Sequence, residues 1–345
     1  MLLGALLLAP LAGGAAPSAP LMQERRARWY ANLEEGQRAA REAGKHVLVD
    51  LSGAGWSEPS REFERAVLGR TEFADGVDAG FVLVRLEFDA DLRARQDRPH
   101  AARNDALRRR LGIEVLPTLV LMTAEGQPYQ SFGLEQLDAG GDPSRAAGAF
   151  IRGLVEAQAR AASLERAVPE ILGAVVRARG ADEASAAAGE AIDLLAAAGE
   201  HPLARPLVPL VQRALEVSGI EPERERAAVG ALAAAAVVDD ALIARALRLD
   251  PANAAGLPEA ALAGAFRGPL DVRRVPALVA RAEALMSGAP VFDRVRAARL
   301  YGDAASRARD QLGDAGRAAR IARFALALEP RDRALRTMLE SLAGG

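Results

Sequence analysis

A chain of 345 residues is long enough for two domains, each able to bury a hydrophobic core of its own. Its 44 basic and 46 acidic residues almost cancel and are interspersed, so we expect no electrostatic attraction to nucleic acid or to an anionic membrane. Cysteine is absent, which excludes disulfides, thiolate nucleophiles and thiolate metal ligands. Because only three histidines remain as imidazole ligands, we predict neither a metal site nor a cofactor.

The amino terminus has the pattern of an export signal. Residues 1–11 are almost purely apolar, and small residues follow up to Ala16. The run is shorter than the ~20 residues of a membrane-spanning helix, so a cleaved signal peptide over residues 1–20 is favoured over an anchor, although no basic residue precedes the run. We therefore predict a mature protein that starts near Pro17, carries no integral membrane segment and is periplasmic or secreted.

Helical and strand patterns alternate over residues 24–164. A charged amphipathic helix is predicted at 24–44, ending on Gly44, followed by a buried strand at 47–51 and a helix at 58–68. Further elements are predicted as a strand at 81–88, an arginine-rich helix at 101–111, strands at 118–122 and 129–132, and a helix at 144–164. This alternation predicts an α/β domain with a mixed sheet.

From about Val168 onward, strand patterns give way to alanine-rich helices separated by Gly or Pro. The stretch 313–330, and more weakly 246–251, resembles the second helix of a tetratricopeptide repeat. We predict an all-α helical-hairpin domain that is tetratricopeptide-like, and leave open whether it is a true repeat array. The expected organisation is a signal peptide at 1–20, an α/β domain at 21–167 and a helical domain at 168–345.

Residues 47–60 resemble the active-site strand and loop of thioredoxins, in which an apolar strand, an Asp and a short loop lead to Trp-Cys-x-Pro-Cys. The loop here reads Trp56-Ser57-Glu58-Pro59-Ser60, so serine occupies both cysteine positions. Residues 112–126 resemble the family segment in which a cis proline opens a strand. That proline is Pro117, and Leu116, Pro117 and Thr118 would then line a binding groove.

The resemblance covers residues 24–165 and implies a thioredoxin-like fold of the kind found in exported proteins. It does not imply thioredoxin chemistry, because an alcohol cannot exchange with a disulfide. We expect Ser57 to act as the N-cap of the following helix, a role that serine fills well. Asp50 matches the family's buried carboxylate, and without thiols to serve it is predicted to be structural, held by hydrogen bonds or water.

A serine nucleophile at Ser57 would need a general base within about 3 Å. His46 lies at the opposite end of the predicted strand, about 15 Å away at the usual rise per residue, and no sequence feature orients His100 toward the loop. Hydrolase chemistry is therefore disfavoured.

The favoured function is a redox-inactive, exported module that binds or scaffolds proteins. The resemblance implies that an extended partner segment pairs with the backbone beside Pro117, a strand addition that needs no thiol. Two alternatives remain: a glutathione-transferase-like enzyme that uses a hydroxyl at a helix N-terminus, and a purely structural assembly protein.

Overall fold

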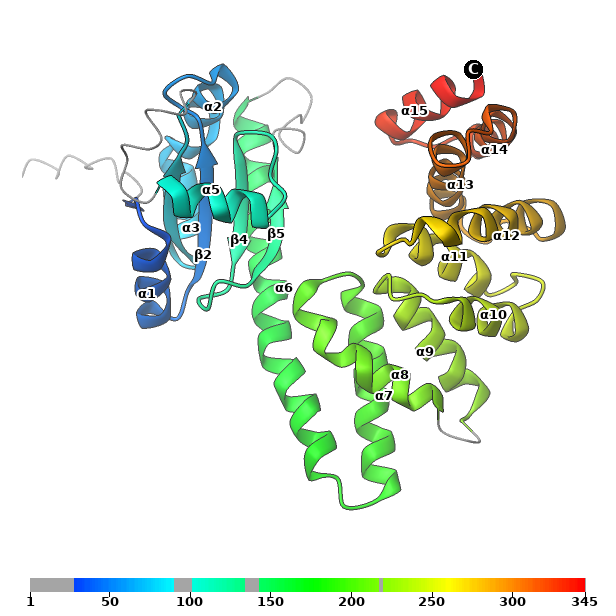
Figure 1. Ribbon diagram of the computed structural model, residues 1–345. Coiled ribbons are helices and arrows are strands. Elements are labelled where there is room, and N and C mark those ends of the chain that lie inside the picture. Colours follow the sequence, from blue (N-terminus) through cyan, green and yellow to red (C-terminus); the bar gives the residue numbers. More distant parts are fainter. Residues whose placement is uncertain (1–27, 90–100, 134–142, 217–219, 345) are drawn as a thin grey trace, which may run out of the picture. The chain divides into compact units, whose positions relative to one another are not determined.

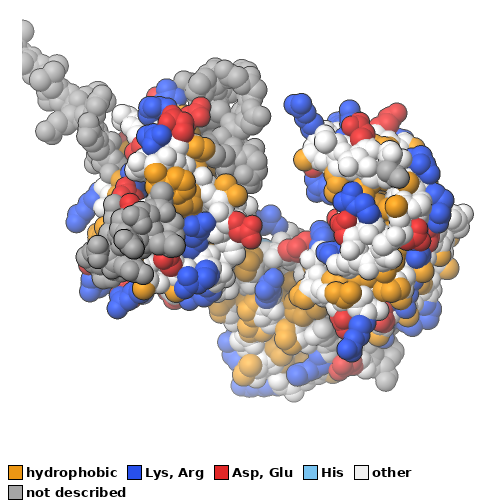
Figure 2. All heavy atoms as spheres, turned by 45° about the horizontal axis from the view of Figure 1, so that its top comes forward, with side chains coloured by type: hydrophobic (Ala, Val, Ile, Leu, Met, Phe, Trp, Pro, Cys, Tyr) orange, Lys and Arg blue, Asp and Glu red, His pale blue; other side chains and the backbone are white. Residues whose placement is uncertain are grey.

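The computed structural model describes residues 28–89, 101–133, 143–216 and 220–344, so the predicted signal peptide and His100 lie outside it. The chain forms two compact units. The first comprises the chain up to Leu119 together with Phe132–Leu154, and the second comprises Val120–Ser131 and the chain from Val155 onward. Acidic and basic side chains are interspersed on the visible face of both units (Figure 2), in keeping with the near-zero net charge.

A five-stranded sheet with the order β1-β3-β2-β4-β5 carries the α/β part of the chain (Figure 1). The strands are β1 (Trp29–Tyr30), β2 (His46–Ser52), β3 (Phe81–Glu87), β4 (Thr118–Met122) and β5 (Pro128–Phe132). β1, β2 and β3 are parallel, whereas a short turn closed by the Thr123 N–H on the Gln127 carbonyl joins β4 to β5 as a hairpin. The sheet is therefore mixed, as predicted, and all seven residues of its central strand β2 are buried.

Helices cover both faces of this sheet. They are α1 (Leu33–Ala43), α2 (Glu58–Phe63), which continues as the π-helical segment η1 (Glu64–Leu68), α3 (Thr71–Asp78), α5 (Ala101–Arg110) and α6 (Pro143–Arg177). α1 and α5 lie on one face, joined by the Glu34–Arg103 ion pair at 3.0 Å, and Phe150 of α6 packs edge-on against Phe63 of α2 on the other (Figure 1).

The first helix begins later than its sequence pattern predicts. Asn32 caps it, with its side-chain oxygen accepting hydrogen bonds from the N–H groups of Glu34 at 2.8 Å and Glu35 at 3.4 Å. Trp29, predicted to be helical, instead pairs with β3. The end is as predicted, because Gly44 takes the left-handed conformation with φ of 63°.

From Val155 onward the second unit is built from helices, as predicted for the carboxyl-terminal half. After α6 these are α7 (Ala181–Ala198), η3 (Pro202–Leu207), α8 (Val208–Glu216), α9 (Pro222–Ala234), α10 (Asp240–Leu249), α11 (Leu257–Arg267), η4 (Val272–Arg274), α12 (Val275–Gly288), α13 (Arg294–Asp310), α14 (Ala315–Ala327) and α15 (Arg333–Gly344). From α7 onward each α-helix packs on the next, and α7, α9, α11, α13 and α15 also pack on one another in turn (Figure 1). This is an array of helical hairpins.

α6 runs without a break through the predicted domain boundary at residues 167 and 168, with Pro169 inside it. The boundary therefore stays a prediction. Within the described residues, no helix combines the length and apolarity needed to cross a membrane.

A buried carboxylate fastens two neighbouring hairpins of the array. Glu259 in α11 is 1% exposed and accepts hydrogen bonds from the N–H groups of Phe292 at 3.1 Å and Asp293 at 3.2 Å, just before α13. The Asn253 side chain donates a further hydrogen bond to it at 3.4 Å. Glu259 therefore helps to hold the start of α13 against α11 through hydrogen bonds.

Candidate functional site

We call residues Gly53–Ser60 the serine loop. It leaves the end of β2 and turns at once, with the Ser57 N–H bonded to the Gly53 carbonyl at 2.7 Å. The Ser57 hydroxyl accepts a hydrogen bond from the Ser60 N–H at 3.4 Å, and the Ser60 hydroxyl accepts one from the Gly53 N–H at 3.2 Å. Both serines are buried, and Ser57 is the N-cap of α2. The two hydroxyls therefore hold the loop in shape.

Trp56 gives the serine loop an exposed apolar surface. Its side chain is 47% exposed, yet its Nε1–H donates a hydrogen bond to the Phe88 carbonyl at 2.7 Å. The ring also lies close over Gly53, where a Cβ atom would sit only 2.9 Å from it. The indole is therefore fixed in place while part of it remains open to a partner.

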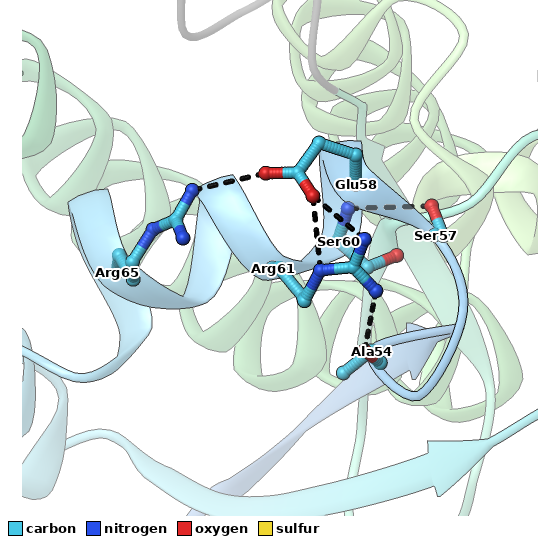
Figure 3. A network of polar contacts seen from close by, with 6 residues as sticks. All are labelled: Ala54, Ser57, Glu58, Ser60, Arg61 and Arg65. Carbon is cyan, nitrogen blue, oxygen red and sulfur yellow. Dashed lines mark hydrogen bonds and ion pairs between the residues drawn. The ribbon is translucent and has the colours of Figure 1, made fainter.

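A charged cluster borders the loop on α2 and η1 (Figure 3). Glu58 forms ion pairs with Arg61 at 2.6 Å and Arg65 at 3.1 Å, and Arg61 also donates to the Ala54 carbonyl at 3.4 Å. Hydrogen bonds from Arg61 and then Arg65 lower the pKa of the Glu58 carboxyl. These side chains form a polar rim at the serine loop, to which Arg61 is tied through the Ala54 carbonyl.

Asp50, the expected buried carboxylate, is 1% exposed and lies in β2 opposite Arg85 of β3. Arg85 donates from Nε to Asp50 Oδ2 at 2.9 Å and from its Nη2 to Glu64 of η1, while its guanidinium lies 4.3 Å from the centre of the Trp29 ring. Burial raises the pKa of Asp50 to about 6, although Arg85 opposes this shift. Sequence analysis identified Asp50 but missed Arg85 and Glu64, because their contact depends on strand register and on the position of η1.

The segment before β4 is fixed by side chains. Arg108 of α5 donates to the carbonyls of Ile113 at 2.9 Å and Glu114 at 2.8 Å. Further on, the Thr118 hydroxyl donates to the Val115 carbonyl at 2.8 Å. This side-chain support holds the turn from both ends.

Between these supports lies Leu116, whose side chain is buried. The Leu116–Pro117 peptide bond is cis, and the preceding Val115 is 69% exposed. Within the described residues, neither the N–H nor the C=O of Leu116 makes a hydrogen bond. A segment of this kind offers a donor and an acceptor next to an apolar side chain.

Part of the chain is similar to known proteins. A family model described as thioredoxin-like matches residues 28–124. The thioredoxin-related protein DsbJ of Chlamydia pneumoniae is 28% identical over 109 residues, which cover 30% of this chain and 30% of that protein. The chain thus spans about a third of the length of this curated relative. A solved structure titled DsbH oxidoreductase is 17% identical, with a TM-score of 0.34, covering 42% of this chain and 94% of the other. Residues 28–124 are a thioredoxin-like domain in a chain that contains no cysteine.

Proposed function

We propose that the thioredoxin-like domain is a redox-inactive module that binds an extended segment of a partner protein outside the cytoplasm. The observation that carries the proposal is the unpartnered backbone of Leu116 beside the exposed Val115. An added strand takes its affinity from main-chain hydrogen bonds of this kind and its specificity from adjacent side-chain contacts.

In the proposed complex, the partner lies between the segment before β4 and the serine loop after β2. β2 and β4 are neighbours in the sheet, which supports this placement. Trp56 would supply a rigid apolar contact to one side of the partner segment, and the rim of Glu58, Arg61 and Arg65 would face its polar groups. Because the Trp56 ring is already held by Phe88, binding would cost little side-chain entropy.

The state of the two serines supports a binding role over an enzymatic one. A hydroxyl that steadies a bound thiolate, as in a glutathione-transferase-like enzyme, must reach the ligand. Ser57 is only 7% exposed and serves as a helix cap, while Ser60 is 1% exposed. Serine in place of cysteine at these two positions leaves the loop folded and removes its redox chemistry.

The proposal also covers the location of the protein and the roles of its two parts. Export is supported by the apolar residues 1–11 and the small residues that follow them. We further propose that residues 21–167 are the binding domain and that residues 168–345 present or support it as a helical scaffold.

The test is site-specific crosslinking in the producing cell. A photoreactive benzoylphenylalanine replaces Val115 in one variant, and in the matched control it replaces Val176, an 85% exposed valine near the end of α6. We expect a protein adduct from position 115 that dithiothreitol does not release, and no such adduct from position 176. Absence of an adduct at 115, or the same adduct at both positions, would contradict the proposal.

A further inference from the structure

The edge strand β5 is held by few side chains. Of its five residues only Tyr129 is buried, whereas Gln130 and Ser131 are exposed. At the end of the strand Phe132 packs edge-on against Phe150 of α6, with the ring centres 5.5 Å apart. The other end of β5, next to the hairpin turn, therefore depends on Tyr129 for its attachment.

Tyr129 packs on a histidine of the helical part. Its ring stacks on the ring of His201, with the ring centres 5.8 Å apart and the planes inclined by 20°. Both residues belong to the second unit, which includes Val120–Ser131. Aromatic pairs in contact stabilise a structure beyond the area that they bury. We call these two stacked rings the ring latch.

His201 is held in place by its own hydrogen bonds, so its ring is a fixed platform for Tyr129. Its N–H donates to the Ala198 carbonyl at 3.3 Å, and its Nδ1 accepts from the Leu203 N–H at 3.3 Å as the N-cap of η3. Arg160 of α6 donates to the same Ala198 carbonyl at 3.1 Å. In a charged imidazole both nitrogens carry protons and neither accepts. The cap of η3 therefore requires a neutral His201.

The surroundings of the ring latch also disfavour a charged His201. From α6, Arg160 acts on the ionisation of His201, and Glu165 acts on that of the latch tyrosine. The neighbouring Glu200 is paired with Arg267 of α11 at 2.9 Å. Burial and then the Arg160 charge lower the pKa of His201. They thus outweigh the attraction of a charged imidazole to the face of the tyrosine ring.

We propose that the ring latch fastens the β4–β5 hairpin to the helices of the second unit at neutral pH and releases it when His201 is protonated. Protonation removes the cap of η3 and places a second positive charge near Arg160, so the imidazole leaves its position against Tyr129. The turn end of β5 then loses its attachment. The hairpin directly follows Pro117, and any effect of the release on partner binding rests on the proposed function. The latch itself is a property of the free protein.

The sign of the pH dependence follows from the lowered pKa of His201. A proton binds more weakly to His201 in the latched state than in the released state. The latch is therefore complete above the ordinary value of 6.5, and it weakens as pH falls from there through the lowered pKa. Hydrogen exchange reports the release, because a strand that opens locally exchanges its amide protons.

Hydrogen exchange followed by mass spectrometry tests the latch on the full chain at pH 5 and pH 7.5, after correction for intrinsic exchange rates. In the wild type, amides of residues 128–132 should open at least about twofold more often at pH 5. His201→Phe keeps an aromatic ring and does not titrate, so this difference should disappear. His201→Asn keeps a cap acceptor but has no ring, so these amides should open more often already at pH 7.5 while the amides of η3 stay protected.

Three results would each overturn the proposal. They are equal opening of residues 128–132 at both pH values in the wild type, a pH difference that survives in His201→Phe, and wild-type protection of these amides in His201→Asn at pH 7.5. In addition, the His201 ring of the wild-type protein, followed by NMR, should titrate with a midpoint below 6.5, and a midpoint at or above 6.5 would also reject the latch.

Neither measurement involves a partner. A failed crosslinking experiment at position 115 would reject the binding function and leave the latch standing. Failure of the exchange experiment would reject the latch and leave the crosslinking result standing.

Discussion

Replacing Ser57 and Ser60 by cysteine should restore a working dithiol pair. The two residues lie three positions apart across the first turn of α2, and side chains at that spacing are neighbours about 5–6 Å apart at Cβ. Adjustment within the turn brings such a pair into the range where a disulfide closes. We expect the double variant to form an intramolecular disulfide in an oxidising glutathione buffer.

The structure also sets the expected acidity of the first thiol. The side chain at position 57 accepts a hydrogen bond from the Ser60 N–H at 3.4 Å, at the N-terminus of a helix. A negative charge at a helix N-terminus gains about 0.3–2 kcal/mol, and about 1.4 kcal/mol corresponds to one pKa unit. The pKa of a cysteine at position 57 should therefore fall from ~8.5 to between about 7.1 and 8.3.

The assay is thiolate absorbance against pH in the single variant Ser57→Cys. Ser163→Cys is the matched control, because Ser163 is exposed in the interior of α6, and its thiol should titrate near ~8.5. If both single variants titrate alike and the double variant keeps free thiols under oxidising conditions, the serine loop does not have the geometry described here.

Two further predictions concern the second unit. Glu259→Ala removes the acceptor for the N–H groups of Phe292 and Asp293, and should lower the free energy of unfolding by about 3–5 kcal/mol in urea denaturation; a loss under about 1 kcal/mol would contradict the role assigned to Glu259. Burial, and then the Arg160 charge, lower the pKa of His201, so its contribution to stability is present above about pH 6.5 and is lost as pH falls below that value. His201→Asn, which keeps a cap acceptor without titrating, should melt with a weaker dependence on pH between 5.5 and 7 than the wild type, and identical slopes would contradict this.

Local chemistry made much of the α/β part predictable. The apolar run after Lys45 and the five residues from Thr118 were placed as strands, and both are strands. Ser57 was expected to cap a helix because serine precedes a proline at the first turn, and Gly44 was expected to end one because only glycine takes its φ without strain. These signals act over a few residues, so one sequence suffices to read them.

The features that could not be predicted from the sequence depend on tertiary contacts. The Asp50–Arg85 pair joins residues 35 apart, and only the register of β2 on β3 brings them together. α3 was not predicted. The helix is short and only two of its residues, Phe73 and Val77, are buried, which is too few to give a helical pattern in the sequence. Trp29 lies in a strand because it pairs with β3 and its ring stacks on Phe73, contacts that override a helical pattern.

The central claim is that the surface around Val115 binds a partner without thiol chemistry. It is tested most directly by calorimetric titration of the partner recovered by crosslinking at position 115. Val115→Asp places a charge where an apolar contact is proposed, and should weaken binding at least about tenfold, equivalent to about 1.4 kcal/mol. Val176→Asp should leave the dissociation constant within about twofold. Equal affinities of the two variants would contradict the account.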